Sequence, residues 1–311
     1  MECETINWLN RHSGKYELSH SGMSGIVNLR EYFKNYELVS ENTLKDEIAS
    51  LHGVKSNRIV ITHGATEAFS MVLFHLREKY KSFHANYPEY EMIYKTPEII
   101  GFNSGNDIFV GSNPNNPTGT MQKIPESKAN IIDETFMEFT DSLDHYSYDN
   151  GFIVNTFTKL YGCGDLRLGY IVAPESADAI KLEGFKGLIT EDVSPINISI
   201  GYKILKNHDA LIKNVKHVMD KNHKILVGQK KKLKFYNNIE PLKIPVSFVD
   251  YSSYTDMASD KLSEALAEEG IIAVPAKFFG LRGPYLRVCT TQPDFEIAYS
   301  RLLDALECYL A

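Results

Sequence analysis

The chain has 311 residues, of which 43% are hydrophobic and 23% are charged, a composition typical of a globular protein large enough for two cores. Its formal net charge of -7 argues against nucleic acid or an anionic membrane as the main partner. The longest apolar runs are strand-sized and the N-terminus lacks a signal-peptide pattern, so neither a membrane span nor an export signal is predicted. Four widely spaced cysteines favour a reducing cytoplasm over disulfides or structural zinc.

The first 35 residues are short polar and aromatic pieces with glycines, and we interpret them as an arm or an irregular cap. Apolar residues at helical spacing predict a helix over 43–51, which Gly53 ends. A second helix is predicted over 66–79. Short apolar runs alternate with helical or loop segments at 58–62, 107–111, 130–133, 151–155 and 168–173. This alternation predicts an α/β fold with a mostly parallel, mixed sheet and helices on both faces.

The pattern changes after about residue 174. Two or three long helices are predicted between residues 176 and 230. The order strand, helix, strand, strand, helix then follows, which is the content of a small α+β domain. We therefore expect an arm (1–35) that belongs to the small domain, a large domain (36–210) and a small C-terminal domain (211–311).

Ligands of such sheets gather at the carboxyl ends of the strands, so the residues that follow each apolar run are candidates for a site. Ala65 and Thr66 open a helix whose free N–H groups suit a phosphate, although a plain strand-to-helix turn explains the same residues. Tyr90 lies just inside a helix predicted from Pro88, where an aromatic ring either stacks on a flat ligand or belongs to the core.

The stretch SNPNNPTGT, residues 112–120, is the most specific sequence in the chain. Two prolines, three asparagines and a glycine predict a rigid, irregular loop that presents side-chain amides in fixed directions. Asp133 ends the next apolar run, where a carboxylate either pairs with the N–H of a cationic ring or caps the following turn.

Lys159 lies in the stretch NTFTKLYGCGDLRLGY, beside the hydroxyls of Thr156 and Thr158 and eight residues before Arg167. An amine, two hydroxyls and a guanidinium so close together indicate a site for a phosphorylated carbonyl compound. The amine would form a Schiff base, while the hydroxyls and the guanidinium would hold the phosphate.

Seven motifs in order resemble those of the class I/II aminotransferases, the fold-type I enzymes that use pyridoxal 5′-phosphate (PLP). They are HGATEAF, YPE followed by tyrosine, NPNNPTGT, DETF, TFTKLYG, RLGY and YLRV. The resemblance covers roughly residues 36 to 310. It is closest to the branch that holds histidinol-phosphate aminotransferase and threonine-phosphate decarboxylase, and it implies a fold-type I large domain with a small α+β domain.

The resemblance also implies a role for each motif residue. Lys159 would form the Schiff base, Asp133 would pair with the pyridine nitrogen, and Asn116 would donate to the phenolic oxygen of the ring. Tyr90 would stack on the ring, and Arg287 would bind the substrate α-carboxylate. The phosphate would be held by Ala65, Thr66, Thr156, Thr158 and Arg167. Tyr36 falls where the family has a tyrosine that reaches the cofactor phosphate of the partner subunit, which implies a homodimer.

Two departures from the family pattern affect the site. Phe136 stands three residues after Asp133, where the family usually has a tyrosine that donates to the phenolic oxygen, so Asn116 would be the remaining side-chain donor. The first 35 residues also lack the usual entry segment. Arg282 either meets a second anionic group of the substrate or is a surface residue.

The expected activity is transfer of an amino group between an amino acid and a 2-oxo acid, both small molecules, by a cytoplasmic PLP enzyme. Decarboxylation of a phosphorylated amino acid is an alternative, because Phe136, Glu138 and Phe139 are similar to the threonine-phosphate decarboxylases at this place. A non-catalytic binding protein with the PLP fold is an alternative from another class.

Overall fold

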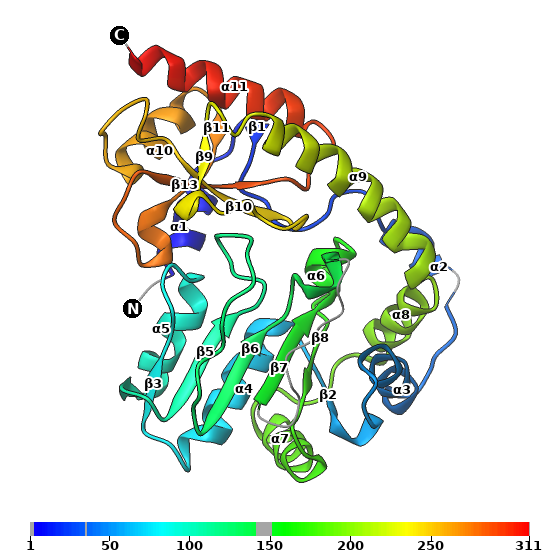
Figure 1. Ribbon diagram of the computed structural model, residues 1–311. Coiled ribbons are helices and arrows are strands. Elements are labelled where there is room, and N and C mark those ends of the chain that lie inside the picture. Colours follow the sequence, from blue (N-terminus) through cyan, green and yellow to red (C-terminus); the bar gives the residue numbers. More distant parts are fainter. Residues whose placement is uncertain (1–2, 35, 141–150, 311) are drawn as a thin grey trace.

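The structure is a computed structural model that describes residues 3–34, 36–140 and 151–310; the ends of the predicted arm (1, 2 and 35) and residue 311 lie outside the described residues. A seven-stranded sheet in the order β2-β8-β7-β6-β5-β3-β4 forms the largest layer (Figure 1). Its strands are β2 (Ile59–Thr62), β3 (Ser82–His84), β4 (Asn103–Ser104), β5 (Ile108–Ser112), β6 (Ala129–Asp133), β7 (Gly151–Thr156) and β8 (Gly169–Val172). Neighbouring strands from β4 to β7 are parallel, whereas β8 is antiparallel to β2 and β7. The predicted mostly parallel, mixed sheet is confirmed.

Both faces of this sheet are covered by helices, and its central strands β5, β6 and β7 are buried at every position. On β6, Ile131 and Ile132 belong to different cores, as expected when successive side chains point to opposite faces. One core includes residues of α4 (Ala65–Arg77), α5 (Glu91–Ile100) and α7 (Ser176–Ile189). The other includes residues of α3 (Glu41–His52), α6 (Phe157–Leu160), α8 (Pro195–Lys206) and the first half of α9 (His208–Gly228), and α2 (Leu29–Lys34) packs against it.

The C-terminal part forms a second layer around a four-stranded antiparallel sheet in the order β12-β13-β10-β9. Its elements are β9 (Lys234–Phe235), β10 (Val246–Asp250), α10 (Ser259–Glu268), β12 (Val274–Pro275), β13 (Tyr285–Cys289) and α11 (Phe295–Glu307). The N-terminal segment joins this part, because β1 (Tyr16–Glu17) pairs in parallel with β11 (Ile271–Ile272). The long helix α9 runs between the two parts (Figure 1). No helix among the described residues is long and apolar enough to cross a lipid bilayer.

Two local predictions were wrong. The arm is not irregular throughout, since it contains α1 (Glu4–Arg11) and α2. Helix α5 begins at Glu91 rather than at Pro88, so Tyr90 precedes the helix with an extended backbone (ψ 132°). The cause is local: the Glu89 carboxylate accepts the Tyr90 N–H at 2.8 Å and holds this turn outside the helix.

Helix α1 forms hydrogen bonds with both the large-sheet part and the C-terminal part of the molecule. The N–H groups of Glu4 and Thr5 donate to the Glu91 carboxylate at 2.8 and 2.7 Å. These first N–H groups have no partner inside the helix, and a carboxylate suits the positive end of the helix dipole. Trp8, which is 2% exposed, donates from Nε1 to Glu264 of α10 at 2.8 Å. The helix therefore bridges α5 and α10.

Replacing Glu91 by alanine should lower the free energy of unfolding by about 2 kcal/mol, because charged hydrogen bonds to Glu4, Thr5 and Lys95 are lost. Burial by itself raises the pKa of Glu91, but hydrogen bonds from Lys95 and Thr5 outweigh burial and lower the pKa. The stabilisation is therefore present at neutral pH and is lost as the pH falls through the lowered pKa. Urea denaturation at several pH values measures both effects.

The matched control is Glu98→Ala, an exposed glutamate on the same helix. An equal loss of stability in both variants would mean that the contact of Glu91 with α1 contributes nothing.

Candidate active site

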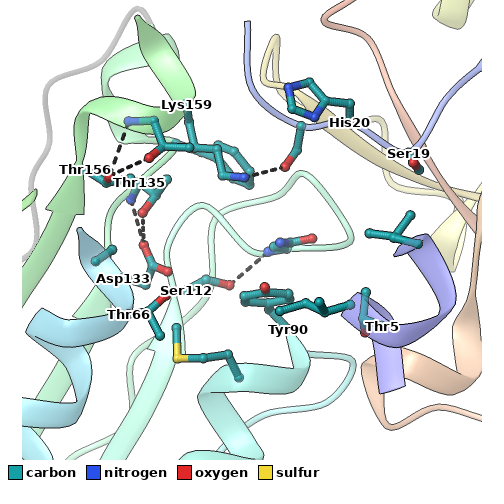
Figure 2. A pocket seen from close by; sticks show the side chains of 18 of the residues that line it. Thr5, Ser19, His20, Thr66, Tyr90, Ser112, Asp133, Thr135, Thr156 and Lys159 are labelled. Atoms are coloured by element: carbon teal, nitrogen blue, oxygen red, sulfur yellow. Dashed lines mark hydrogen bonds between the residues drawn. The ribbon is translucent and has the colours of Figure 1, made fainter. Parts of the chain in front are cut away.

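A pocket of about 440 Å³ lies where strands of the large sheet end, facing the small domain and α1 (Figure 2). Every residue predicted to bind cofactor or substrate lines this pocket, apart from Tyr36: Ala65, Thr66, Tyr90, Asn116, Asp133, Thr156, Thr158, Lys159, Arg167 and Arg287. Parallel strands present their carboxyl ends at one edge of a sheet, which explains why residues far apart in sequence meet here. The structure thus brings these side chains together, while their individual roles remain predictions.

One corner of the pocket brings a guanidinium next to a helix N-terminus. Gly64 (φ 102°) leads from β2 into α4, and the Nη2 of Arg167 donates to the neighbouring His63 carbonyl at 3.1 Å. A Cβ on Gly64 would lie 2.8 Å from this Nη2, so only glycine lets the guanidinium lie against the turn. The N–H groups of Ala65 and Thr66 open the helix at the same corner. A helix N-terminus and a guanidinium together suit a phosphate.

Two hydroxyls extend this corner. Thr156 precedes α6, and its Oγ1 accepts the Thr158 N–H at 3.2 Å. The same Oγ1 lies 3.0 Å from the Thr158 hydroxyl and 3.0 Å from the Leu168 carbonyl oxygen, to which it donates. Both threonines line the pocket together with Arg167, so hydroxyl donors and a cation share one wall.

Asp133, at the end of β6, presents a buried carboxylate. Its Oδ1 accepts the Thr135 N–H at 2.9 Å and also the Thr135 hydroxyl. Its Oδ2 accepts no hydrogen bond from the described part of the chain. Burial raises the pKa of Asp133, although the hydrogen bonds from Thr135 act in the opposite direction. A cationic N–H placed at Oδ2 would stabilise the ionised carboxylate.

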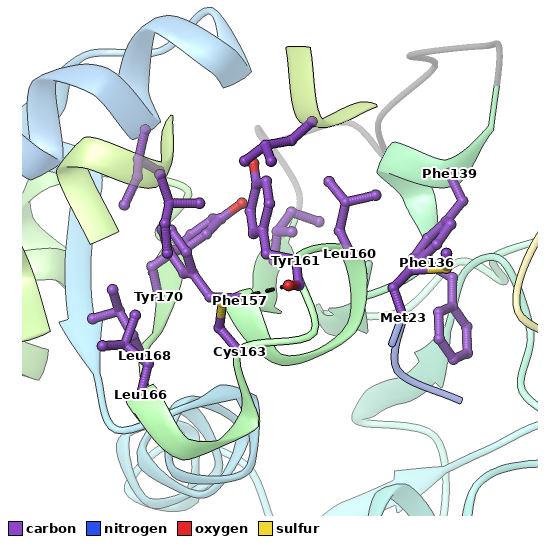
Figure 3. Packing of buried hydrophobic residues seen from close by; sticks show 14 of the residues in the cluster. Met23, Phe136, Phe139, Phe157, Leu160, Tyr161, Cys163, Leu166, Leu168 and Tyr170 are labelled. Atoms are coloured by element: carbon purple, nitrogen blue, oxygen red, sulfur yellow. Dashed lines mark hydrogen bonds between the residues drawn. The ribbon is translucent and has the colours of Figure 1, made fainter. Parts of the chain in front are cut away.

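The residues next to Lys159, in α6 and directly after it, are anchored in a hydrophobic core. Phe157, Leu160 and Tyr161 are all buried there (Figure 3). The Lys159 amine reaches into the pocket and donates to the Ser21 hydroxyl at 3.1 Å (Figure 2). Burial and then the positive charge of Arg287 lower the pKa of this amine. The unprotonated, nucleophilic form is therefore more accessible at neutral pH than in an exposed lysine.

Arg287, on β13, is a buried guanidinium that has no acidic partner among the described residues. Nη2 donates to the Ser19 carbonyl at 2.7 Å, and Nη1 lies 3.4 Å from Oδ1 of Asn116. The guanidinium also lies over the Phe279 ring at 5.3 Å from its centroid. Its Nε is buried without a hydrogen-bond partner. A buried cation with an unused donor is the arrangement expected where a ligand supplies a carboxylate or phosphate.

Glu89 holds the asparagine-rich loop (residues 112–120) in place through hydrogen bonds. This fully buried carboxylate accepts hydrogen bonds from the Ser112 N–H (2.9 Å), the Ser112 hydroxyl (2.5 Å) and Gln122 (3.0 Å). The Ser112 hydroxyl in turn accepts the Asn116 N–H at 2.9 Å. Burial raises the pKa of Glu89 to about 8, against the effect of these hydrogen bonds. Sequence reasoning missed Glu89, whose one signal was an acidic residue inside a turn between aromatic residues.

The N-terminal segment supplies a wall of the pocket that sequence reasoning also missed. The residues are Thr5, Ile6 and Leu9 of α1, followed by His12, Glu17, Ser19, His20 and Ser21. Figure 2 shows Thr5 entering from α1 and His20 close to Lys159. Apolar residues spaced three or four apart in α1 were the signal that would have predicted this helix.

Three further residues have clear positions. Phe136 lines the pocket, is 4% exposed and makes an edge contact with Phe139, so no hydroxyl occurs at this place (Figure 3). Arg282 is exposed and does not line the pocket, which favours its interpretation as a surface residue. Tyr36 is half-buried against the hydrophobic core outside the pocket, and its predicted contact concerns a second subunit.

A family model described as aminotransferase class I and II matches residues 68–302. Histidinol-phosphate aminotransferase 2 of Archaeoglobus fulgidus is 24% identical over 333 aligned residues, which cover 97% of this chain and 92% of that protein. Histidinol-phosphate aminotransferase of Pyrococcus furiosus is 24% identical over 251 residues, covering 70% and 73%.

Solved structures share the fold. A PLP-dependent aminotransferase from Streptococcus suis superimposes with a TM-score of 0.83 at 20% identity, covering 100% of this chain and 97% of that chain. An aspartate aminotransferase double mutant from Thermus thermophilus gives a TM-score of 0.81 at 14% identity, covering 99% and 94%.

The lowered pKa predicts that Lys159 condenses with an aromatic aldehyde at a lower pH than an exposed lysine such as Lys234. Borohydride trapping and mass spectrometry of peptides measure the pH profile of each lysine. Arg287→Met removes the second cause of the lowered pKa, so the profile of Lys159 should move to higher pH.

Arg282→Met is the matched control, since Arg282 is exposed outside the pocket and should leave the profile unchanged. Identical profiles for Lys159 and Lys234 in the unaltered protein would contradict the prediction.

Proposed function

The chain belongs to the class I and II aminotransferases, enzymes that transfer amino groups with PLP, and we propose that Lys159 binds this cofactor covalently. The substrates in this proposal are an amino acid and a 2-oxo acid. The observation that carries it is the meeting of a buried amine, a buried carboxylate with a free oxygen, and an anion-binding corner in one pocket. Each group matches one functional part of PLP.

The donor set of the pocket fits the cofactor. The phosphate would be held by Arg167, by the threonine hydroxyls and by the first N–H groups of α4, and the absence of a Cβ at Gly64 keeps that corner open. The free Oδ2 of Asp133 suits the N–H of a protonated pyridine ring. Tyr90 lines the pocket and offers an aromatic face to the ring.

When bound, the cofactor supplies a carbonyl carbon that condenses with amines and a conjugated ring that accepts the electron pair released at the substrate Cα. Asp133 would keep the ring nitrogen protonated, because an ionised carboxylate beside that nitrogen stabilises its positive charge. The Lys159 amine, with its lowered pKa, would take a proton from the substrate Cα and return it as a general base and acid. Arg287 would hold the substrate carboxylate and thereby fix which Cα bond is aligned to break.

Phe136 makes Asn116 the side-chain donor to the ring oxygen. Oδ1 of Asn116 is oriented to accept from Arg287, which leaves its amide N–H groups as donors. A decarboxylase of a phosphorylated substrate would need a second anion site besides Arg287. Arg282 is exposed and lies outside the pocket, so it does not provide this second site.

Lys159→Ala should abolish both the visible absorbance of bound PLP and the formation of 2-oxo acid, because the covalent anchor and the proton carrier are lost together. Absorbance spectra and a coupled 2-oxo acid assay measure this, with the exposed Lys181→Ala as control. Full turnover in Lys159→Ala would overturn the assignment. Release of CO2 in place of a 2-oxo acid by the unaltered enzyme would replace transamination by decarboxylation.

We also infer a homodimer in which Tyr36 reaches the cofactor phosphate of the partner subunit. The support is local, since Phe33 and Leu38 on either side of Tyr36 are 48% and 69% exposed and would offer apolar surface to a second subunit. Native mass spectrometry should give twice the mass of the chain. Leu38→Glu should yield monomers, whereas Ile180→Glu, at an equally exposed apolar residue of α7, should not. A monomeric unaltered protein would contradict the proposal.

For the compartment we infer the cytoplasm. All four cysteines are unpaired, and Cys163 and Cys289 are buried thiols, as expected of a protein in a reducing environment. Recovery of the native protein from an oxidising compartment would contradict this inference.

A further inference from the structure

Glu17 places an unpaired carboxylate in the wall of the pocket. It is the last residue of β1, and the residue after it, Leu18, is fully buried, which anchors the segment in the small domain. Its Oε1 accepts the Ser19 N–H at 2.6 Å and the Ser19 hydroxyl at 2.5 Å. Among the described residues, none donates to Oε2 and no cation forms an ion pair with Glu17. One oxygen of this carboxylate therefore remains available to a ligand.

Ser19 holds this carboxylate and the Arg287 guanidinium on the same wall. Its N–H and hydroxyl donate to Glu17, while its carbonyl accepts from Nη2 of Arg287 at 2.7 Å. The two opposite charges are thus fixed by one residue without forming an ion pair with each other. A ligand that bridges them must carry an anionic group and, separately, a cationic group or N–H donor.

This inference rests on the proposed function, which assigns some of the charged side chains of the pocket to the cofactor and leaves the others for the substrate. The phosphate would use Arg167, the ring nitrogen would use Asp133, and the carbonyl carbon would use Lys159. Arg287 and Glu17 then remain as the charged side chains that line the pocket without an ion-pair partner in the described part of the chain. A second carboxylate or phosphate on the substrate would meet the repulsion of Glu17.

The two histidines of the pocket do not offset this negative charge. His12 lies 2.9 Å from Oε2 of Glu264, so its ring is engaged outside the pocket. Burial and the positive charge of Lys159 lower the pKa of His20, which favours the neutral ring. Neither histidine therefore supplies a free cation for a second anion.

We propose that Glu17 is a specificity-determining residue that binds the side-chain nitrogen of a basic amino acid while Arg287 binds its carboxylate. The class comprises amino acids with an ammonium, guanidinium or imidazole group. Ile6 and Leu9 of α1 and Met92 of α5 line the same pocket and supply apolar surface for the aliphatic part of such a side chain. A charged hydrogen bond between substrate and Glu17 provides the discrimination.

The test uses the PLP-loaded enzyme and compares kcat/KM for lysine, ornithine, arginine and histidine with kcat/KM for aspartate, glutamate and alanine. The unaltered enzyme should prefer at least one basic amino acid over both acidic ones by about tenfold or more. In Glu17→Gln the loss for that basic amino acid should exceed the loss for alanine by roughly 10- to 100-fold, the effect of one charged hydrogen bond. Glu17→Arg should reverse the preference towards aspartate and glutamate.

Controls separate this role from folding. Glu296→Gln makes the same change on an exposed face of α11 and should leave all rates unchanged. Glu17→Asp keeps the charge and should retain part of the preference. The visible absorbance of bound PLP verifies that each variant is folded and loaded.

Two results would overturn the inference while the proposed function stands: a loaded enzyme that prefers acidic amino acids, or equal losses for basic amino acids and alanine in Glu17→Gln. Absence of bound PLP and of turnover in the unaltered enzyme would instead contradict the proposed function itself.

Discussion

Lys159 and Asp133 lose their hydration in the pocket, and the surrounding structure compensates for part of that loss. Thr135 satisfies one oxygen of Asp133, and the Ser21 hydroxyl accepts from Lys159. Burial displaces the pKa of each group towards its neutral form. Ionisable groups prepared in this way suit proton transfer and the binding of a charged ring better than hydrated ones do. The rigid strand ends and the buried neighbours of Lys159 matter because they prevent either group from turning towards water.

The half of the pocket that faces the substrate depends on different contacts. It is built from the N-terminal segment and β13, which belong to the small domain, whereas the anion corner belongs to the large sheet. Ser19 connects the two charged side chains of this half. In the proposed function, the chemistry common to the family would therefore be carried by one layer of the fold, and the selection of a substrate by the other. Family membership accordingly identifies the reaction type more readily than the substrate.

The parts of the fold that could be predicted from the sequence are those with local signals. Strands β5 to β7 are buried on both faces and contain apolar runs, and Lys159, Asp133 and Asn116 lie at or shortly after strand ends in recognisable motifs. Helix α1 carries only a short local signal, the spacing of Ile6 and Leu9, and its first N–H groups are satisfied by a carboxylate 86 positions later in the chain, a contact that no local pattern indicates. Glu17 and Glu89 were not predicted as site residues for the same reason. An isolated glutamate in a sequence is typical of a surface residue, and only the fold shows that it lies in the pocket or is buried beside it.

Helix α9 contributes Leu211, Val215 and Met219 to a core of the large sheet and Leu226 to the core of the small domain. One uninterrupted helix is thus shared by two hydrophobic cores. Because helix formation is cooperative along a continuous segment, loss of one core would remove part of the support of the other. Denaturation of the two parts is thereby linked through α9, although the anion corner and Arg287 lie on separate sheets. Because α9 packs in both cores, it connects the two halves of the site within one folded unit.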